Sequence, residues 1–205
     1  MNKNKYLDDL KEIKDIMEKS TKFISLSGIS GIIVGIIALV AAWVTYTTVY
    51  YEQDYFVYRK VILSSELVIR ILLIAGITLF LSILTGILFT RKKARQNNQK
   101  LWDLHTRRLI SSLMIPLGTG GILCLIILYQ GFIGYLAPFT LIFYGLALVN
   151  ASKFSLPEIK SLGLAEILLG LAGTFFIGYG LLLWAIGFGL LHIAYGIIME
   201  VRYRT

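Results

Sequence analysis

The sequence has very few of the residues that disulfide scaffolds and catalytic metal sites require. Cys124 is the only cysteine, and the chain has two histidines. A disulfide framework or a thiolate metal cluster is therefore excluded within one chain. The sequence also has no carboxylate cluster for divalent ions and no glycine-rich phosphate loop after a strand. We expect a protein that is not an enzyme and that uses no metal and no cofactor.

Charged residues are also scarce, at 16% of 205 residues, whereas 57% are hydrophobic and the mean hydropathy is +0.74. This composition lies outside the range of ordinary soluble domains. A bilayer core of about 30 Å needs about 20 helical residues per crossing. Residues 23–200 therefore predict an all-α, polytopic integral membrane helical bundle with six transmembrane helices. The predicted spans are residues 23–47, 65–90, 109–129, 132–150, 161–179 and 181–199.

The basic residues are distributed unevenly along the chain. Of the 20 Lys and Arg, 17 lie before Phe23, in residues 91–108, in residues 151–160 or after Glu200. By the positive-inside rule, this distribution puts the N-terminus, the C-terminal tail (residues 201–205) and two connectors on the cytoplasmic side. Nucleic acid is not an expected partner, because the basic stretches lack interleaved aromatics and any docking motif.

The connector of residues 91–108 has the highest density of positive charge and predicts contact with anionic lipid headgroups. The alternative is a solvated loop that only orients the chain. The expected contact residues are Arg91, Lys92, Lys93, Arg95, Arg107 and Arg108.

Residues 1–22 predict a cytoplasmic amphipathic helix, because Tyr6, Leu10, Ile13 and Met17 are spaced by four, three and four. Such a helix can lie on the bilayer surface or beneath the bundle. The same spacing also fits a short coiled-coil seam for self-association or for a partner helix. Two heptads do not decide between these interpretations.

Small residues in the first span predict close helix packing. Ser27, Gly31 and Gly35 are spaced by four and share one helix face, which allows two backbones to approach in lipid. The contact can lie within the chain or between two copies in a homo-oligomer.

In the second span, Glu66 and Arg70 are also four apart, and they predict either an ion pair on the outer side or a solute or proton site.

The last four spans read as one helical hairpin used twice, over residues 109–150 and 160–199. The segment Phe132-Ile133-Gly134-Tyr135 recurs 44 residues later as Phe176-Ile177-Gly178-Tyr179. Apolar, glycine-rich sequence also matches itself easily, so the repeat is a prediction of duplication that rests on short segments.

The second copy alone contains an acid and a histidine. If its turn lies near Gly180, Glu166 is about level with Ala194 and within about one turn of His192 and Tyr195. A carboxylate and an imidazole on neighbouring helices can share a proton or an ion pair. Three interpretations stay open: a functional polar site, a structural pair, and a glutamate that reaches the headgroups.

The closing stretch GYGLLLWAIGFGLLHIAYGIIMEVRY resembles the C-terminal part of a family of uncharacterised small polytopic bacterial membrane proteins. The resemblance implies a bacterial plasma membrane location and carries no activity.

The sequence leaves two candidate functions. The first is a non-enzymatic accessory, sensor or scaffold that contacts a membrane or cytoplasmic protein partner through its N-terminal helix and basic loop. The second is a small oligomeric channel or transporter with a polar site near Glu166 and His192.

Overall fold

The computed structural model describes residues 28–50, 64–96 and 104–202, without the side chains of Tyr50 and His105. The predicted N-terminal helix, Ser27 and residues 203–205 lie outside the described residues. Within those ranges the secondary structure is helical and contains no strand, which confirms the all-α prediction. The α-helices are α2 (Gly28–Thr45), α3 (Ser65–Gln96), α4 (Leu104–Tyr129), α5 (Leu136–Ala151), α6 (Pro157–Phe175), α7 (Gly180–Trp184) and α8 (His192–Arg202). Short 3-10 segments are η2 (Ile133–Tyr135), η3 (Ser152–Phe154) and η4 (Ile177–Tyr179), and the π-helical segments are η1 (Tyr46–Tyr50) and η5 (Ala185–Leu191).

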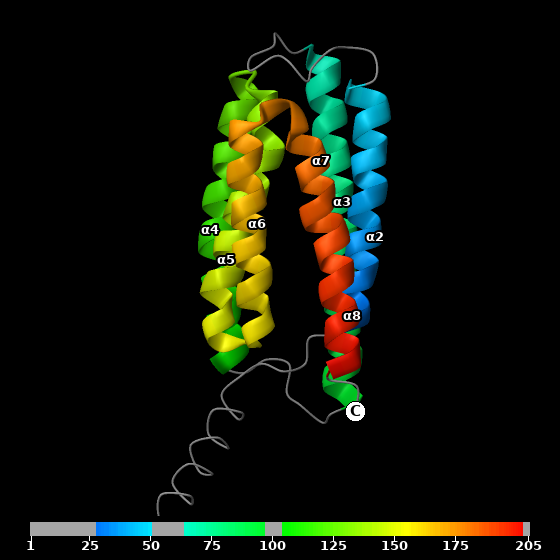
Figure 1. Cartoon of the computed structure of the whole chain (residues 1–205), viewed down its shortest axis with the longest axis vertical. Helices are drawn as coiled ribbons and strands as arrows, with labels where there is room; N and C mark the ends of the chain where they lie inside the picture. The colour runs from blue at the N-terminus through cyan, green and yellow to red at the C-terminus, as the bar shows by residue number, and fades with distance from the viewer. Residues whose placement is uncertain (1–27, 51–63, 97–103, 203–205) are drawn as a thin grey trace, which may run out of the picture.

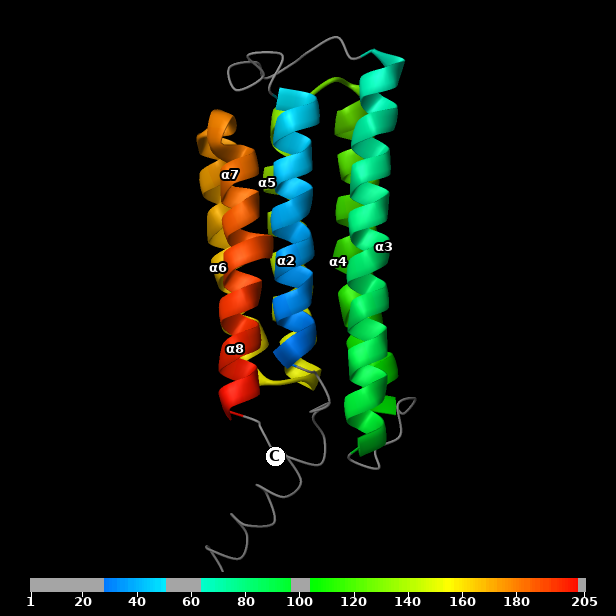
Figure 2. The same cartoon turned by 90° about the vertical axis from the view of Figure 1, so that its right-hand side faces the viewer.

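The long helices run side by side along one axis and form two groups (Figure 1). In one group, α5 packs against both α4 and α6. In the other, α2 packs against α3 and against α8 with the preceding η5, so that α2 lies between α8 and α3 (Figure 2). The turn from α6 through η4 into α7 connects the two groups at one end of the molecule.

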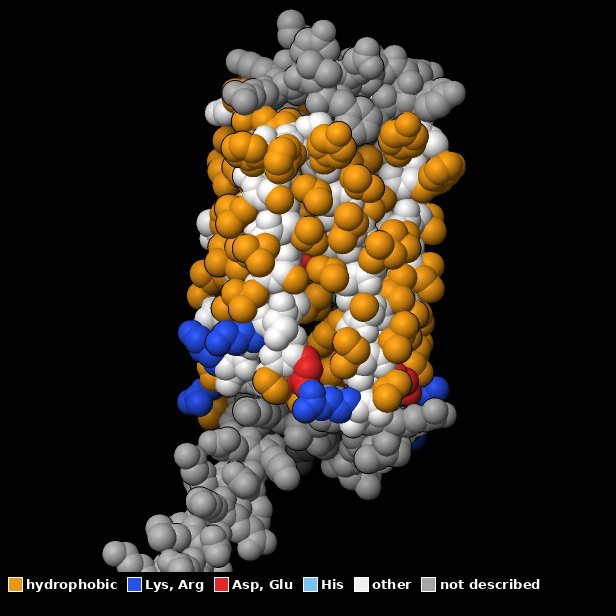
Figure 3. All heavy atoms as spheres, viewed as in Figure 1, with side chains coloured by type: hydrophobic (Ala, Val, Ile, Leu, Met, Phe, Trp, Pro, Cys, Tyr) orange, Lys and Arg blue, Asp and Glu red, His pale blue; other side chains and the backbone are white. Residues whose placement is uncertain are grey.

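The sides of the molecule are apolar. Large side chains such as Phe80, Ile115 and Leu168 are exposed there, and hydrophobic groups cover most of the face seen in Figure 3. Among the described residues, five helical stretches are long and apolar enough to cross a membrane, judged by length and composition. They are Gly28–Val49, Ser65–Gln96, Thr106–Tyr129, Ile133–Phe154 and Ile177–Arg202. Helix α6 runs beside them but carries Glu158, Lys160 and Glu166 within 19 residues, so the sixth span stays a prediction.

Both flanking helices extend into the predicted basic connector of residues 91–108. Helix α3 continues to Gln96 and α4 begins at Leu104, whereas the predicted spans end at residue 90 and begin at residue 109. Lys, Arg, Ala and Gln are good helix formers, and cations are favourable in the last turn of a helix. Residues 91–96 and 104–108 are therefore helical, so the alternative of a solvated loop does not describe them, while the ends of the membrane-spanning parts stay a prediction.

The two predicted hairpins turn through the same backbone corner. Phe132 (φ −85°, ψ 57°) and Phe176 (φ −102°, ψ 70°) each precede one turn of 3-10 helix. The first corner follows a Schellman motif, in which Gly131 has a φ of 80° and Phe132 N–H donates to the Ile127 carbonyl at 2.9 Å. The repeated sequence thus has a repeated local structure, while a duplication of the whole hairpin stays a prediction.

Candidate functional site

Glu166 of α6 and His192 at the start of α8 face each other inside the bundle. The Glu166 Oε1 atom lies 3.4 Å from His192 Nδ1. Glu166 is fully buried, and only 4% of the His192 surface is exposed. The helical hairpin positions both residues, because two antiparallel helices leaving one turn keep equally distant residues level. The predicted approach of these two residues is therefore present in the structure.

Hydrogen bonds at both ring nitrogens fix the orientation of His192. Nδ1 lies 3.0 Å from the Gly187 carbonyl oxygen, and Nε2 lies 2.8 Å from the Tyr144 hydroxyl. Because a carbonyl oxygen only accepts, we assign a hydrogen to Nδ1. In the neutral ring, the Tyr144 hydroxyl then donates to Nε2. Tyr144 thus belongs to this site, although the sequence reasoning did not find it.

The Glu166 carboxylate has a less complete set of partners. Among the described residues, neither of its oxygens has a hydrogen-bond partner, and His192 Nδ1 is the ion-pair contact. Gly187 provides the space for this carboxylate, since a Cβ atom there would collide with Glu166 Oε2 and with Leu141 Cδ2. A buried carboxylate without donors is costly unless it carries a proton or faces a cation.

Aromatic side chains line the helix face that carries His192. Trp184, Phe188 and His192 follow one another at intervals of four, and the Phe188 and His192 rings are stacked with centroids 5.8 Å apart. On α5, Tyr144 contacts Phe188 at a centroid distance of 4.8 Å, and Thr140 Oγ1 accepts a hydrogen bond from Trp184 Nε1 at 3.1 Å. Both contacts join residues 44 apart, which is the shift of the sequence repeat.

Tyr195 lies almost one turn beyond His192 on α8. Its side chain packs against the buried cluster of Leu148, Ile159 and Leu162. A second acid–base pair connects α6 with α8 closer to their ends, where Arg202 Nη1 lies 2.9 Å from Glu158 Oε1. Glu158 and Arg202, like Glu166 and His192, lie at about equal distances along the chain from the turn between α6 and α7. The sequence could therefore have predicted this pair as well.

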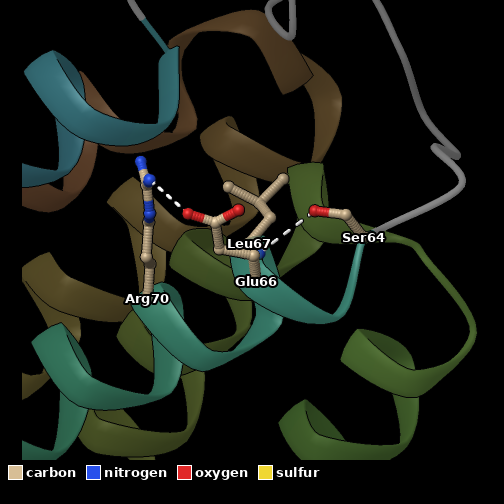
Figure 4. A network of polar contacts seen from close by, with 4 residues as sticks. All are labelled: Ser64, Glu66, Leu67 and Arg70. Carbon is tan, nitrogen blue, oxygen red and sulfur yellow. Dashed lines mark hydrogen bonds and ion pairs between the residues drawn. The ribbon is translucent and has the colours of Figure 1, made fainter.

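The ion pair that the sequence predicts between Glu66 and Arg70 lies at the start of α3, far from the buried site. Arg70 Nη2 lies 2.6 Å from Glu66 Oε1, and both side chains are exposed (Figure 4). Ser64 caps this helix by accepting a hydrogen bond from Leu67 N–H at 3.2 Å. An exposed i,i+4 ion pair stabilises a helix only weakly. In this ion pair, each of the two charges faces an opposite charge about one helical turn away.

The predicted headgroup residues lie on two helix ends. The last turns of α3 carry Arg91, Lys92, Lys93 and Arg95, and the first turns of α4 carry Arg107 and Arg108. An open pocket of about 470 Å³ is lined by Arg91, Lys92, Arg95 and Gln96. Lys and Arg gather at this lower end on the face seen in Figure 3.

The glycines of the first span contact another helix of the same chain. A Cβ on Gly31 would lie 3.2 Å from Gly196 Cα, and one on Gly35 would lie 2.7 Å from the Gly189 carbonyl oxygen. Helix α8 and η5 therefore occupy the face that the homo-oligomer alternative would use.

Within the described residues, no group of three or more His, Cys, Asp or Glu side chains could hold a metal ion. Comparison of the chain with protein-family models, with curated proteins and with solved structures finds no match. The interpretation of the buried site therefore depends on its geometry.

Proposed function

We propose that this protein is a six-span integral protein of the bacterial plasma membrane and acts as a non-enzymatic accessory, sensor or scaffold. In this proposal both termini and the basic ends of α3 and α4 lie on the cytoplasmic side. Its interaction surfaces are the N-terminal helix of residues 1–22 and the basic helix ends.

The main support for this proposal is that basic side chains and apolar surface lie on separate parts of the molecule. The exposed sides of α3 and α4 are apolar over most of their length, whereas basic side chains concentrate in the last turns of α3 and the first turns of α4. A bilayer would cover the apolar sides and leave the basic end among headgroups and cytoplasm. Clustered Lys and Arg beside a transmembrane helix favour anionic lipid.

The pocket at the end of α3 suggests where a headgroup phosphate would bind. Arg91, Lys92 and Arg95 are all exposed and line the same open space. Several cations around one cavity can donate charge-assisted hydrogen bonds to phosphate oxygens. We expect this surface to concentrate anionic lipid or an acidic segment of a partner protein.

Native mass spectrometry of the purified protein tests lipid binding. The triple variant Arg91→Gln, Lys92→Gln, Arg95→Gln should lose most of the phosphatidylglycerol that the unmodified protein retains. Arg70→Gln is the matched control, because it removes a cation at the opposite end of the same helix. Equal lipid retention in the triple variant and the control would contradict the proposed surface.

Affinity purification tests the scaffold role separately. Deletion of residues 1–22 or the triple substitution should remove specific proteins from the co-purified set, whereas Arg70→Gln should leave that set unchanged. An identical set from all variants would remove the support for these surfaces.

The buried pair of Glu166 and His192 favours a second candidate, a small oligomeric channel or transporter. Ionisable groups within membrane spans often mark a solute or proton path. Flux measured in proteoliposomes should fall in Glu166→Gln and His192→Leu and persist in Glu158→Gln. Flux that is unchanged in the first two variants would exclude these residues from a pathway.

A further inference from the structure

Helices α6 and α8 meet through two acid–base pairs and through the packing of Tyr195 against the buried cluster of Leu148, Ile159 and Leu162. Most of the packing of α6 is against α5, and most of the packing of α8 is against α2. Between α6 and α8, Glu158–Arg202 lies near the helix ends, with Arg202 well exposed, whereas Glu166–His192 is buried. This seam joins the two helix groups of Figure 1, and its inner pair is shielded from water.

We propose that Glu166, His192 and Tyr144 form a site that binds one exchangeable proton and that this proton holds α6 against α8. The inference depends on the proposed membrane placement but not on the scaffold role. The ligand is a proton taken from water and returned to water, and no bond between heavy atoms changes.

Charge balance defines the number of protons. With one proton, the pair is either a neutral carboxylic acid beside a neutral imidazole or a carboxylate beside an imidazolium, and its net charge is zero in both cases. Without that proton, a buried carboxylate faces a neutral ring. The apolar surroundings penalise this state strongly, because an uncompensated buried charge loses its hydration.

The hydrogen bonds show where the proton can reside. The Nδ1 position already carries the hydrogen that faces the Gly187 carbonyl at 3.0 Å. The additional proton therefore belongs on Glu166 or on His192 Nε2, which faces the Tyr144 hydroxyl at 2.8 Å. A hydroxyl can rotate from donor to acceptor, so Tyr144 can satisfy Nε2 in either protonation state.

Within the described ranges, no other charge is placed to neutralise the site. The neighbouring α5, α7, η5 and α2, over their described residues, contain no Asp, Glu, Lys, Arg or His. Other titratable groups near the seam are Tyr195 on α8 and, at its end, the Glu158–Arg202 pair with Lys160. Loss of the proton would therefore draw water or a cation into the seam and separate α6 from α8.

The motion would not require the main helix contacts to break. Close backbone packing holds α5 to α6, where a Cβ on Gly145 would lie 2.5 Å from the Gly163 carbonyl oxygen. Similar packing holds α2 to α8 at Gly31 and Gly196. Separation of the two groups would therefore keep these contacts and break those that join α5 to His192 and Phe188 across the seam.

Distance measurement between spin labels tests this proposal. The full chain carrying Cys124→Ser, Leu164→Cys and Ile197→Cys is labelled in lipid nanodiscs, with one exposed label on α6 and one on α8. Raising the pH from mildly acidic to strongly alkaline should lengthen or broaden the distance distribution in a single one-proton transition. Glu166→Gln should abolish the transition, and Glu158→Gln should keep it.

Infrared difference spectroscopy of the unmodified protein gives a second readout that requires no substitution. A protonated-carboxyl band, or an imidazolium band in its place, should disappear over the same pH range as the distance change. A transition that persists in Glu166→Gln, a distance that does not respond to pH, or a distance change without either band would overturn the proposal. Because lipid retention at Arg91, Lys92 and Arg95 is measured separately, failure of either proposal leaves the other testable.

Discussion

At the scale of single residues, the Tyr144 hydroxyl is the partner that distinguishes His192 from a histidine held only by its own helix. The Tyr144 hydroxyl on α5 is hydrogen-bonded to Nε2, and Nδ1 donates to the Gly187 carbonyl oxygen. Removing one partner of a buried hydrogen bond leaves the other unsatisfied, at a cost of about 1–3 kcal/mol.

We therefore expect Tyr144→Phe to lower the free energy of unfolding by about 1–3 kcal/mol, measured by equilibrium unfolding in detergent micelles. Tyr129→Phe is the control, because 93% of the Tyr129 surface is exposed and the change should have little effect. Equal stability of the two variants would show that the Tyr144–His192 bond contributes nothing.

The sequence predicted the approach of Glu166 and His192 because both lie in one hairpin and the rise of a helix is fixed. It did not predict Tyr144, which is 48 residues from His192 and belongs to the other hairpin. Contacts between hairpins depend on how helices pack in three dimensions, and spacing along the chain does not determine this packing. The space left by Gly187 for the carboxylate also requires the folded structure.

At the scale of elements, glycines determine how closely the helices approach. Without a hydrophobic force between helices in lipid, small residues and van der Waals packing stabilise helix pairs. At Gly145 the atoms nearest a Cβ would include the Gly163 carbonyl oxygen and the Ile167 nitrogen, and rigid backbone atoms cannot move aside as a flexible side chain can.

Gly145→Ala should therefore destabilise the protein by about 1–3 kcal/mol through overpacking, and thermal unfolding of the solubilised protein measures the effect. Gly121→Ala in α4 is the matched control, since a Cβ there meets open space. The control should be neutral or more stable by up to about 1 kcal/mol, because alanine favours helix. Destabilisation of both variants to the same degree would contradict close α5–α6 packing.

The apolar runs predicted where the helices lie along the sequence, but they did not predict the residues at which the helices end. Helix α3 continues to Gln96 because basic and polar residues with good helix propensity follow the apolar segment. The π-helical segment Ala185–Leu191 was also absent from the prediction, since a local change in helical pitch leaves no clear mark in hydropathy. Such segments occur frequently at functional sites, and this one contains Gly187.

At the scale of the whole molecule, the composition predicted the class of fold more readily than the neighbours of each helix. Helices that are apolar on all sides lack the polar face that indicates orientation in a soluble bundle. The pairing of α2 with α8 therefore became visible only in the structure, although Gly31 and Gly35 had indicated a close contact.

The proposed membrane arrangement has six crossings with the basic ends in the cytoplasm, and it depends most on whether α6 crosses. Labelling of single cysteines in a Cys124→Ser background with a membrane-impermeant maleimide tests it directly. The positions Gln96, Gln130, Lys153 and Phe176 are all exposed. Gln96 is the last residue of α3, and the other three follow α4, α5 and α6, respectively. Cysteines at 130 and 176 should be labelled in intact cells, whereas those at 96 and 153 should be labelled only after permeabilisation. Labelling of positions 153 and 176 from the same side, or of position 96 in intact cells, would contradict the account.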